Sequence, residues 1–131
     1  MNDHELGFLT FLAEPTKRRM ETLLELGEKR RADVRDLLHH SVRLDTRFCQ
    51  HLNGGEAFTN WVEAALQKRG APSTCYVLAV DKGLDGREMP LRSALANVIG
   101  MGDAGFISCI PGRLGFYEYS AAQSSYLLHR P

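Results

Sequence analysis

The alternation of apolar and polar positions is clearest between Gly105 and Tyr119, where two runs rich in aromatic and β-branched residues flank Pro111-Gly112. Strand, turn and strand in this order predict a β-hairpin. Phe106 would face one side of the sheet and Ile107 the other, and the second run alternates in the same way. Because both faces carry apolar side chains, we expect both sides of the hairpin to be covered.

A second strand is predicted from Thr74 to Val80, a short apolar run with little alternation that is typical of a strand covered on both faces. A polar turn follows, and Pro90 then opens a short helix. The residues from Asp81 to Ala104 are enough for a right-handed crossover, which would lay the first hairpin strand parallel to this strand. The alternative is a sheet whose strands are all antiparallel. The tail is either a loop that ends in a short strand at Tyr126 to Leu128 or a frayed terminus.

Helical spacing dominates the first half of the chain. After a brief helix that begins near Asp3, one apolar stripe continues in phase and predicts a single long helix from about Pro15 to about Leu44. The stripe consists of Met20, Leu24, Gly27, Arg31, Val34, Leu38 and Val42. The alternative is a break between Gly27 and Ala32 that gives a helical hairpin, since glycine costs about 1 kcal/mol in a helix interior.

The length of this helix suggests how the chain would assemble. About 30 residues span about 45 Å, whereas a compact domain of this size is only about 35 to 40 Å across. The protruding apolar stripe would need a cover, and the same stripe on a second copy, packed about a two-fold axis, provides one. We therefore expect a homodimer through the long helix.

A third helix is expected from Glu56 to Arg69, because its apolar residues recur at i, i+3, i+4, i+7 and i+8 and Gly70 follows its basic last turn. Trp61 belongs to this apolar set. We expect it to anchor the helix to the core, with stacking on a ligand as the less common alternative.

Together these elements predict an α+β fold: N-terminal helices including one long helix, then a small sheet of three to four strands with one short packed helix. The length of 131 residues suits one domain, with a helical portion over residues 1–70 and a β-α-β-β portion over residues 71–131.

Composition and charge limit the classes of partner that this chain is expected to bind. The 16 basic residues equal the 16 acidic ones, so no field of one sign gathers nucleic acid or an anionic membrane. No apolar stretch reaches the roughly 20 residues of a membrane-spanning helix, and the acidic N-terminus lacks the pattern of a signal peptide. Three scattered cysteines, Cys49, Cys75 and Cys109, do not suggest a disulfide scaffold. We expect a cytoplasmic protein that binds neither nucleic acid nor membranes.

Motifs that could hold a cofactor or a metal ion fail on context. Gly100 to Gly105 match G-x-G-x-x-G, but a helix precedes the motif where a strand is required. Asp81 to Gly86 resemble the start of a calcium loop, but Gly83 and Arg92 stand where carboxylates are needed. His39 and His40 are candidate metal ligands, but they point about 100° apart on a helix and so do not converge on one ion. We therefore expect neither a cofactor nor a metal ion.

One cluster of residues carries a functional hypothesis. If the strands of Tyr76 and Phe106 were parallel, polar side chains would gather at the carboxyl edge of the sheet, where open α/β sheets bind ligands. These are Asp85, Arg87, Glu88, Cys109 and Arg113. An arginine could bind an anionic ligand, and Cys109 could act as a nucleophile if a histidine reached it.

Two functions remain open on this basis. The first is a non-enzymatic module, acting as a homodimer, that binds a protein or a small ligand; it rests on the apolar stripe, the balanced charge and the lack of a recognisable catalytic set. The alternative is a small enzyme with its site at Asp85, Arg87, Glu88, Cys109 and Arg113. Residue patterns alone do not identify the ligand.

Overall fold

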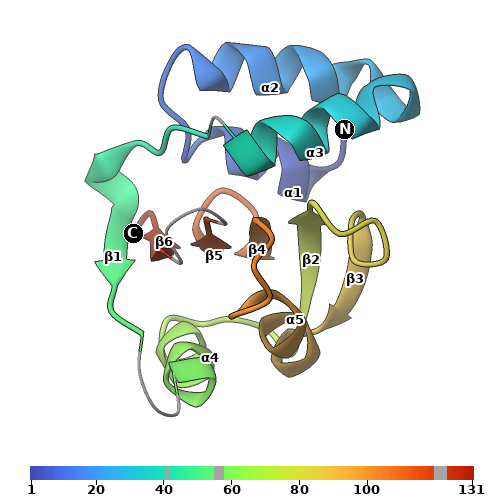
Figure 1. Cartoon of the computed structure of the whole chain (residues 1–131). Coiled ribbons are helices and arrows are strands. Elements are labelled where there is room, and N and C mark those ends of the chain that lie inside the picture. Colours follow the sequence, from blue (N-terminus) through green and yellow to red (C-terminus); the bar gives the residue numbers. More distant parts are fainter. Residues whose placement is uncertain (41, 55–57, 120–123) are drawn as a thin grey trace.

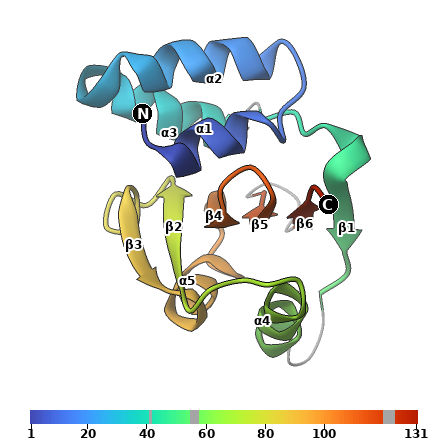
Figure 2. The same ribbon diagram turned by 180° about the vertical axis from the view of Figure 1, so that it is seen from behind.

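The protein is a three-layer sandwich in which an antiparallel sheet lies between two groups of helices (Figure 1). The computed structural model describes residues 1–40, 42–54, 58–119 and 124–131. Helices α1, α2 and α3 cover one face of the sheet, and α4 and α5 cover the other (Figures 1 and 2). Each side has its own cluster of buried apolar residues.

The sheet has six strands in the order β1-β6-β5-β4-β2-β3, and all neighbours are antiparallel. The bounds are Cys49–Leu52 for β1, Thr74–Ala79 for β2, Arg87–Pro90 for β3, Gly105–Ile110 for β4, Leu114–Glu118 for β5 and Ser125–His129 for β6. The prediction of three to four strands is therefore wrong. The predicted strand near Tyr126 exists as β6, whereas β1 and β3 are short, partly polar segments without a strand-like pattern.

The predicted hairpin is confirmed as β4 and β5, which pair from Gly105↔Glu118 to Ile110↔Leu114 with a register shift between Ser108 and Ile110. The alternation is confirmed for Phe106 and Ile107, whereas Ile110, beyond the register shift, packs on the same side as Ile107. Phe106 contributes to the core beneath α1, α2 and α3, and Ile107 to the core above α4 and α5.

The parallel arrangement of β2 and β4 is wrong, and the antiparallel alternative is correct. The reason lies in β3. The chain turns back after β2 and pairs β3 against it, from Thr74↔Pro90 to Val77↔Arg87. Helix α5, Leu91–Val98, then connects β3 to β4, so the crossover joins β3 and β4, which flank β2. Because the sequence did not predict β3, the direction predicted for β4 relative to β2 was reversed.

The expected single helix from Pro15 to Leu44 is also wrong. Helix α2, Thr16–Glu25, is followed by the 3-10 turn η1, Gly27–Arg30, and by α3, Arg31–His40. Gly27 has φ of +72°, a left-handed conformation that glycine adopts without a steric penalty. The two helices lie side by side and bury both halves of the stripe in one core (Figures 1 and 2). The hairpin alternative is correct, and the stripe needs no second copy to cover it.

Helix α4, Phe58–Lys68, agrees with the predicted third helix and is the longest α-helix of the described residues. The expected start at Glu56 lies outside those residues. Val62 and Leu66 hold the helix against the sheet. Trp61 does not, because 53% of it is exposed, so its expected role as a core anchor is wrong.

Helix α1, Asp3–Leu9, begins with Asn2, whose side chain accepts a hydrogen bond from the amide of Glu5. Another 3-10 turn, η2, Thr46–Phe48, precedes β1. None of the helices formed by the described residues has the length and apolar character needed to cross a membrane.

Candidate functional site

The antiparallel order separates the five residues that the sequence grouped. Asp85 lies in the turn between β2 and β3, beside the carboxyl end of β2. Arg113 lies in the turn between β4 and β5, at the opposite end of the sheet, and Cys109 is buried near it. Arg87 and Glu88 are exposed on β3. The five therefore do not form one site, because the grouping depended on parallel strands.

Asp85 instead belongs to a cluster of four polar side chains between the helical layer and β2. The guanidinium of Arg31 contacts both carboxylates of this cluster. It donates from Nε to Asp85 Oδ2 at 2.7 Å, from Nη2 to Asp85 Oδ1 at 3.1 Å and from Nη1 to Glu5 Oε2 at 2.8 Å. The Tyr76 hydroxyl donates to Glu5 Oε2. We call Glu5, Arg31, Tyr76 and Asp85 the ionic cluster.

Each member of the ionic cluster comes from a different element. Glu5 is on the buried side of α1, together with Phe8 and Leu9 at i+3 and i+4. Arg31 is the first residue of α3, where the turn at Gly27 redirects the chain. Asp85 is fixed by the amide of Ala79, which donates to its Oδ1 at 3.1 Å.

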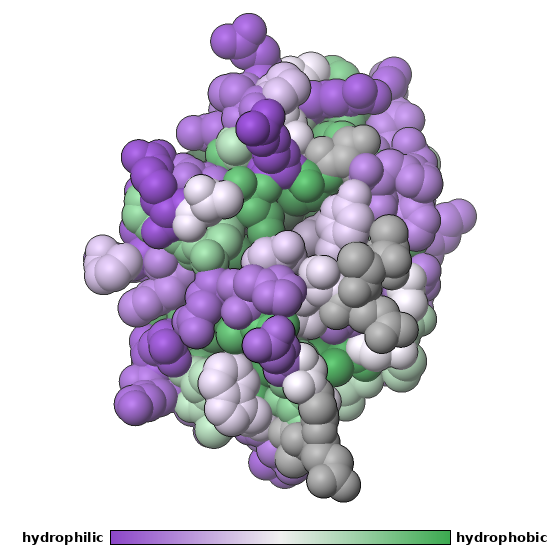
Figure 3. All heavy atoms as spheres, turned by 60° about the vertical axis from the view of Figure 1, so that its left-hand side comes forward, coloured by the Kyte–Doolittle hydropathy of each residue, from purple (hydrophilic) through white to green (hydrophobic). Residues whose placement is uncertain are grey.

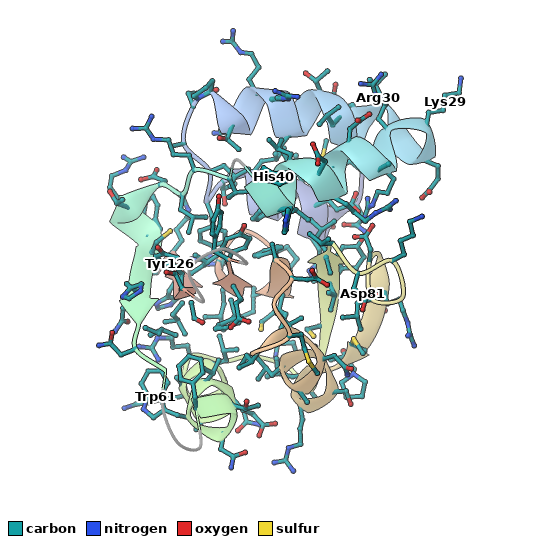
Figure 4. All side chains as sticks on the ribbon, viewed as in Figure 1. Lys29, Arg30, His40, Trp61, Asp81 and Tyr126 are labelled. Carbon is teal, nitrogen blue, oxygen red and sulfur yellow. The ribbon has the colours of Figure 1, made fainter. Side chains whose placement is uncertain are left out.

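The neighbours of Arg31 behave differently, although the three form one basic run in the sequence. Lys29 and Arg30 project outward from the turn between α2 and α3 (Figure 4). Arg30 pairs with Asp33 at 2.7 Å, and both side chains are half-exposed. The run is thus a solvated surface with one member turned inward.

Hydrogen bonds and burial shift the pKa values of Arg31 and Tyr76 in the ionic cluster. Burial alone would lower the pKa of Arg31, but hydrogen bonds to Asp85, Glu5 and Tyr76 outweigh it and raise the pKa above its ordinary value. Burial, followed by the hydrogen bond to Glu5, raises the pKa of Tyr76. Arg31 therefore stays cationic and Tyr76 stays a neutral hydrogen-bond donor at pH 7.

A hollow of about 540 Å³ opens beside the ionic cluster and is lined by all four of its members. Two further cations line it. Arg35 lies one helical turn beyond Arg31, with its Nη1 3.5 Å from Asp85 Oδ2, and Lys82 comes from the turn between β2 and β3. Arg35 makes only this long contact with a carboxylate of the described residues, and its side chain, which is 17% exposed, forms part of the lining of the hollow.

His4 and Ser108 both lie next to Tyr76. The ring of His4 stacks on that of Tyr76 with 5.4 Å between centroids, and its Nδ1 lies 2.6 Å from Ser108 Oγ. A histidine beside a serine hydroxyl can activate a nucleophile only if substrate reaches the hydroxyl. Ser108 is 1% exposed, so the pair acts as packing in this conformation.

The cysteines do not provide an activated thiol. All three are free, and Cys75 and Cys109 are buried. Burial raises the pKa of Cys109, with a smaller contribution from Cys75, and burial raises the pKa of Cys75 to about 12. A nucleophilic cysteine needs a depressed pKa, so the geometry gives Cys109 no catalytic advantage.

The motifs that resembled cofactor or metal sites have structural roles. Gly100 and Gly102 have φ of +75° and +85° in the connection from α5 to β4. Asp81 Oδ1 accepts from the amide of Gly83 at 2.7 Å, which closes the polar turn after β2. Within the described ranges no three metal-ligating side chains converge.

Comparison with known proteins returned no matching family model, no matching curated protein and no matching solved structure. The site therefore rests on its own geometry. Of the ionic cluster, sequence reasoning identified only Asp85. One signal for Glu5 was present, a carboxylate on the apolar side of a short helix, but nothing in the residue pattern indicated that α3 would bring Arg31 to it.

Proposed function

We propose that this protein is a small-ligand-binding module whose ligand carries a carboxylate or phosphate group, which binds in the hollow beside the ionic cluster. Arg35 and Lys82 would donate to the anion. Arg31 would form the back wall, because its donors are already directed to Glu5, Tyr76 and Asp85. The sequence suggested an anionic ligand at Arg87 or Arg113. We now assign that ligand to Arg35 and Lys82.

One observation carries the proposal: a buried, hydrogen-bonded ionic cluster forms a wall of an open hollow. Buried ion pairs contribute little net stability, because removing the charges from water offsets their attraction. Apolar residues of similar size would hold α1 and α3 to the sheet at least as well. A preorganised charged wall with an adjacent arginine is instead typical of a site that orients a polar ligand.

Arginine is suited to this role by its shape. Its planar guanidinium donates two parallel hydrogen bonds to a carboxylate or phosphate, so it fixes orientation as well as charge. Arg31 already binds Asp85 in this manner, and Arg35 could bind a ligand likewise. The enzymatic alternative lacks such support, since the described residues offer no accessible nucleophile beside a base.

We further propose that the module acts in a reducing, cytoplasmic setting and as a homodimer. Three free thiols support the former. The dimer can no longer be argued from a long helix, so it needs another surface.

The test is to titrate inorganic phosphate and acetate into the protein while recording amide chemical shifts by NMR. Saturable shifts at residues 82–86 and 31–35 are the expected result, with binding about tenfold weaker in Arg35→Ala. Arg19→Ala, which removes an exposed arginine from α2, is the matched control. Shifts that are absent, or equally weakened by both variants, would contradict the proposal. Native mass spectrometry would also reveal a co-purified ligand.

A further inference from the structure

The two edges of the sheet are built differently. Edge strand β3 reads Arg-Glu-Met-Pro, so it carries two charges and ends in a proline, which are features that prevent pairing with another strand. Edge strand β1 reads Cys-Gln-His-Leu and has neither a proline nor a lysine, arginine or carboxylate. It pairs with β6 in continuous register from Cys49↔Leu128 to Leu52↔Ser125, without a bulge. Strand β1 is therefore an unprotected edge.

The outer side of β1 has no strand partner among the described residues. The strand lies at the margin of the molecule in both opposite views, with no other ribbon beyond it (Figures 1 and 2). In an antiparallel strand every second residue points its amide and carbonyl away from its neighbour. Those groups of β1 are open to a further strand.

An aromatic pair lies beside this edge, in which Trp61 is exposed and Phe58 is partly buried against the core. Trp61 and Phe58 on α4 stack with 6.4 Å between ring centroids and an interplanar angle of 9°. Together with residues 50–54 they line a hollow of about 380 Å³. Figure 3 views this side of the molecule, where apolar surface is visible in hollows between polar side chains, and Figure 4 places Trp61 on the outside of α4. Exposed tryptophan is a common anchor of protein interfaces.

We propose that β1 pairs antiparallel with β1 of a second copy of this chain, about a two-fold axis perpendicular to the sheet. The two sheets then join into one. This symmetry keeps each face on its own side, so helices α4 of the two copies approach one another and Trp61 and Phe58 become buried between them.

Charge and symmetry favour a second copy over a foreign peptide. A strand paired antiparallel with itself presents the same residues to both partners. The four residues of β1 are uncharged when His51 is neutral, and the nearby Arg47 is paired with Asp45 at 2.6 Å. No like charges within β1 are therefore forced together. The chain as a whole has a formal net charge of zero, so long-range repulsion between copies is absent.

This dimer surface is independent of the proposed anion site. Strand β1 is at one margin of the sheet, while β2 and the turn that carries Asp85 and Lys82 are near the other. Arg35→Ala should impair anion binding and leave the dimer intact. Loss of the dimer should in turn leave anion binding unchanged, so one proposal can fail without the other.

The full-length protein allows two readouts of the dimer. Sedimentation equilibrium reports its mass, and Trp61, the only tryptophan, reports the interface by fluorescence. We expect a dimer that dissociates on dilution, with a shift of the emission maximum to longer wavelength as Trp61 becomes hydrated. Amide hydrogen exchange within β1 should be slower at high protein concentration than at low concentration.

Two variants test the geometry. Gln50→Lys places like charges beside the two-fold axis, and Trp61→Ala removes the anchor. Each should weaken the dimer at least about tenfold, which corresponds to about 1.4 kcal/mol. Ala96→Lys and Leu26→Ala make the same kinds of change at exposed sites on α5 and beside α2, and they should leave the dimer unchanged. A monomer at every concentration, or a dimer that neither β1 nor α4 variant weakens, would overturn the proposal.

Discussion

At Gly7, helix α1 passes close to the turn between β4 and β5. A Cβ atom at this position would lie 2.2 Å from the backbone nitrogen of Gly112 and 2.8 Å from the carbonyl carbon of Pro111. Both are backbone atoms, so they cannot move aside as a flexible side chain would. The helical layer and the hairpin therefore meet at a residue that must lack a side chain.

Gly7→Ala should lower the free energy of unfolding by about 2 kcal/mol or more, because α1 must separate from the hairpin turn to make room. In an isolated helix the same change would stabilise by about 1 kcal/mol. The sign of the change in unfolding free energy therefore shows whether Gly7 packs against the turn between β4 and β5. Urea denaturation measures the difference. Gly54→Ala is the control, since its added Cβ has no atom within 4 Å among the described residues other than its chain neighbours, and it should change stability by less than about 0.5 kcal/mol.

At the scale of elements, the turn at Gly27 determines the arrangement of the helical layer. Residues Met20 and Leu24 of α2 and Val34 and Leu38 of α3 keep one helical phase across the turn, and all four are buried in the same core. The phase is the same for one long helix and for two that fold together. A periodic pattern therefore identifies the buried residues without establishing that the helix is continuous.

Gly27→Ala should destabilise the protein by about 1 kcal/mol, because alanine at φ of +72° is strained although the space around its Cβ is empty. Gly27→Asn should lose less stability than Gly27→Ala, since asparagine tolerates a left-handed backbone conformation better. Thermal unfolding compares these variants with Lys29→Ala, an exposed change in η1. Equal stability of Gly27→Ala and wild type would mean that Gly27 is not held in this conformation.

The strands show what the residue pattern could and could not predict. The hairpin β4 and β5, with buried side chains on both faces, was predictable because its apolar alternation is strong and its turn contains Pro111-Gly112. Strands β1 and β3 have four residues each, of which β1 exposes two and β3 three, so their pairing depends on the neighbouring strand and not on their own pattern. Only tertiary structure could reveal them, and with them the direction of β4.

At the scale of the whole molecule, the ionic cluster connects the helical layer to the sheet. Arg31 contacts a carboxylate on α1 and another in the turn after β2. Asp85 was predictable as a polar residue after a buried strand. Its partners were not, because Glu5, Arg31 and Asp85 are far apart in sequence and meet only when the hairpin of α2 and α3 packs on the sheet. A site assembled from elements that are far apart in the sequence leaves little trace in local spacing.

Arg31→Met should lower the free energy of unfolding by about 3 to 5 kcal/mol, since it leaves the buried carboxylates of Glu5 and Asp85 without their main cation. Arg30→Met, one residue earlier, removes a half-exposed pair with Asp33 and should cost less than about 1 kcal/mol. Guanidinium chloride is unsuitable here because it screens charge, so urea denaturation is the measurement.

A third variant separates charge from shape in the same experiment. Arg31→Lys retains the cation but loses the planar fork that donates to Asp85 through two nitrogens. Its stability should fall between those of wild type and Arg31→Met. If all three proteins unfold at the same urea concentration, the ionic cluster does not hold the layers together, and apolar packing of α1 and α3 alone maintains the fold.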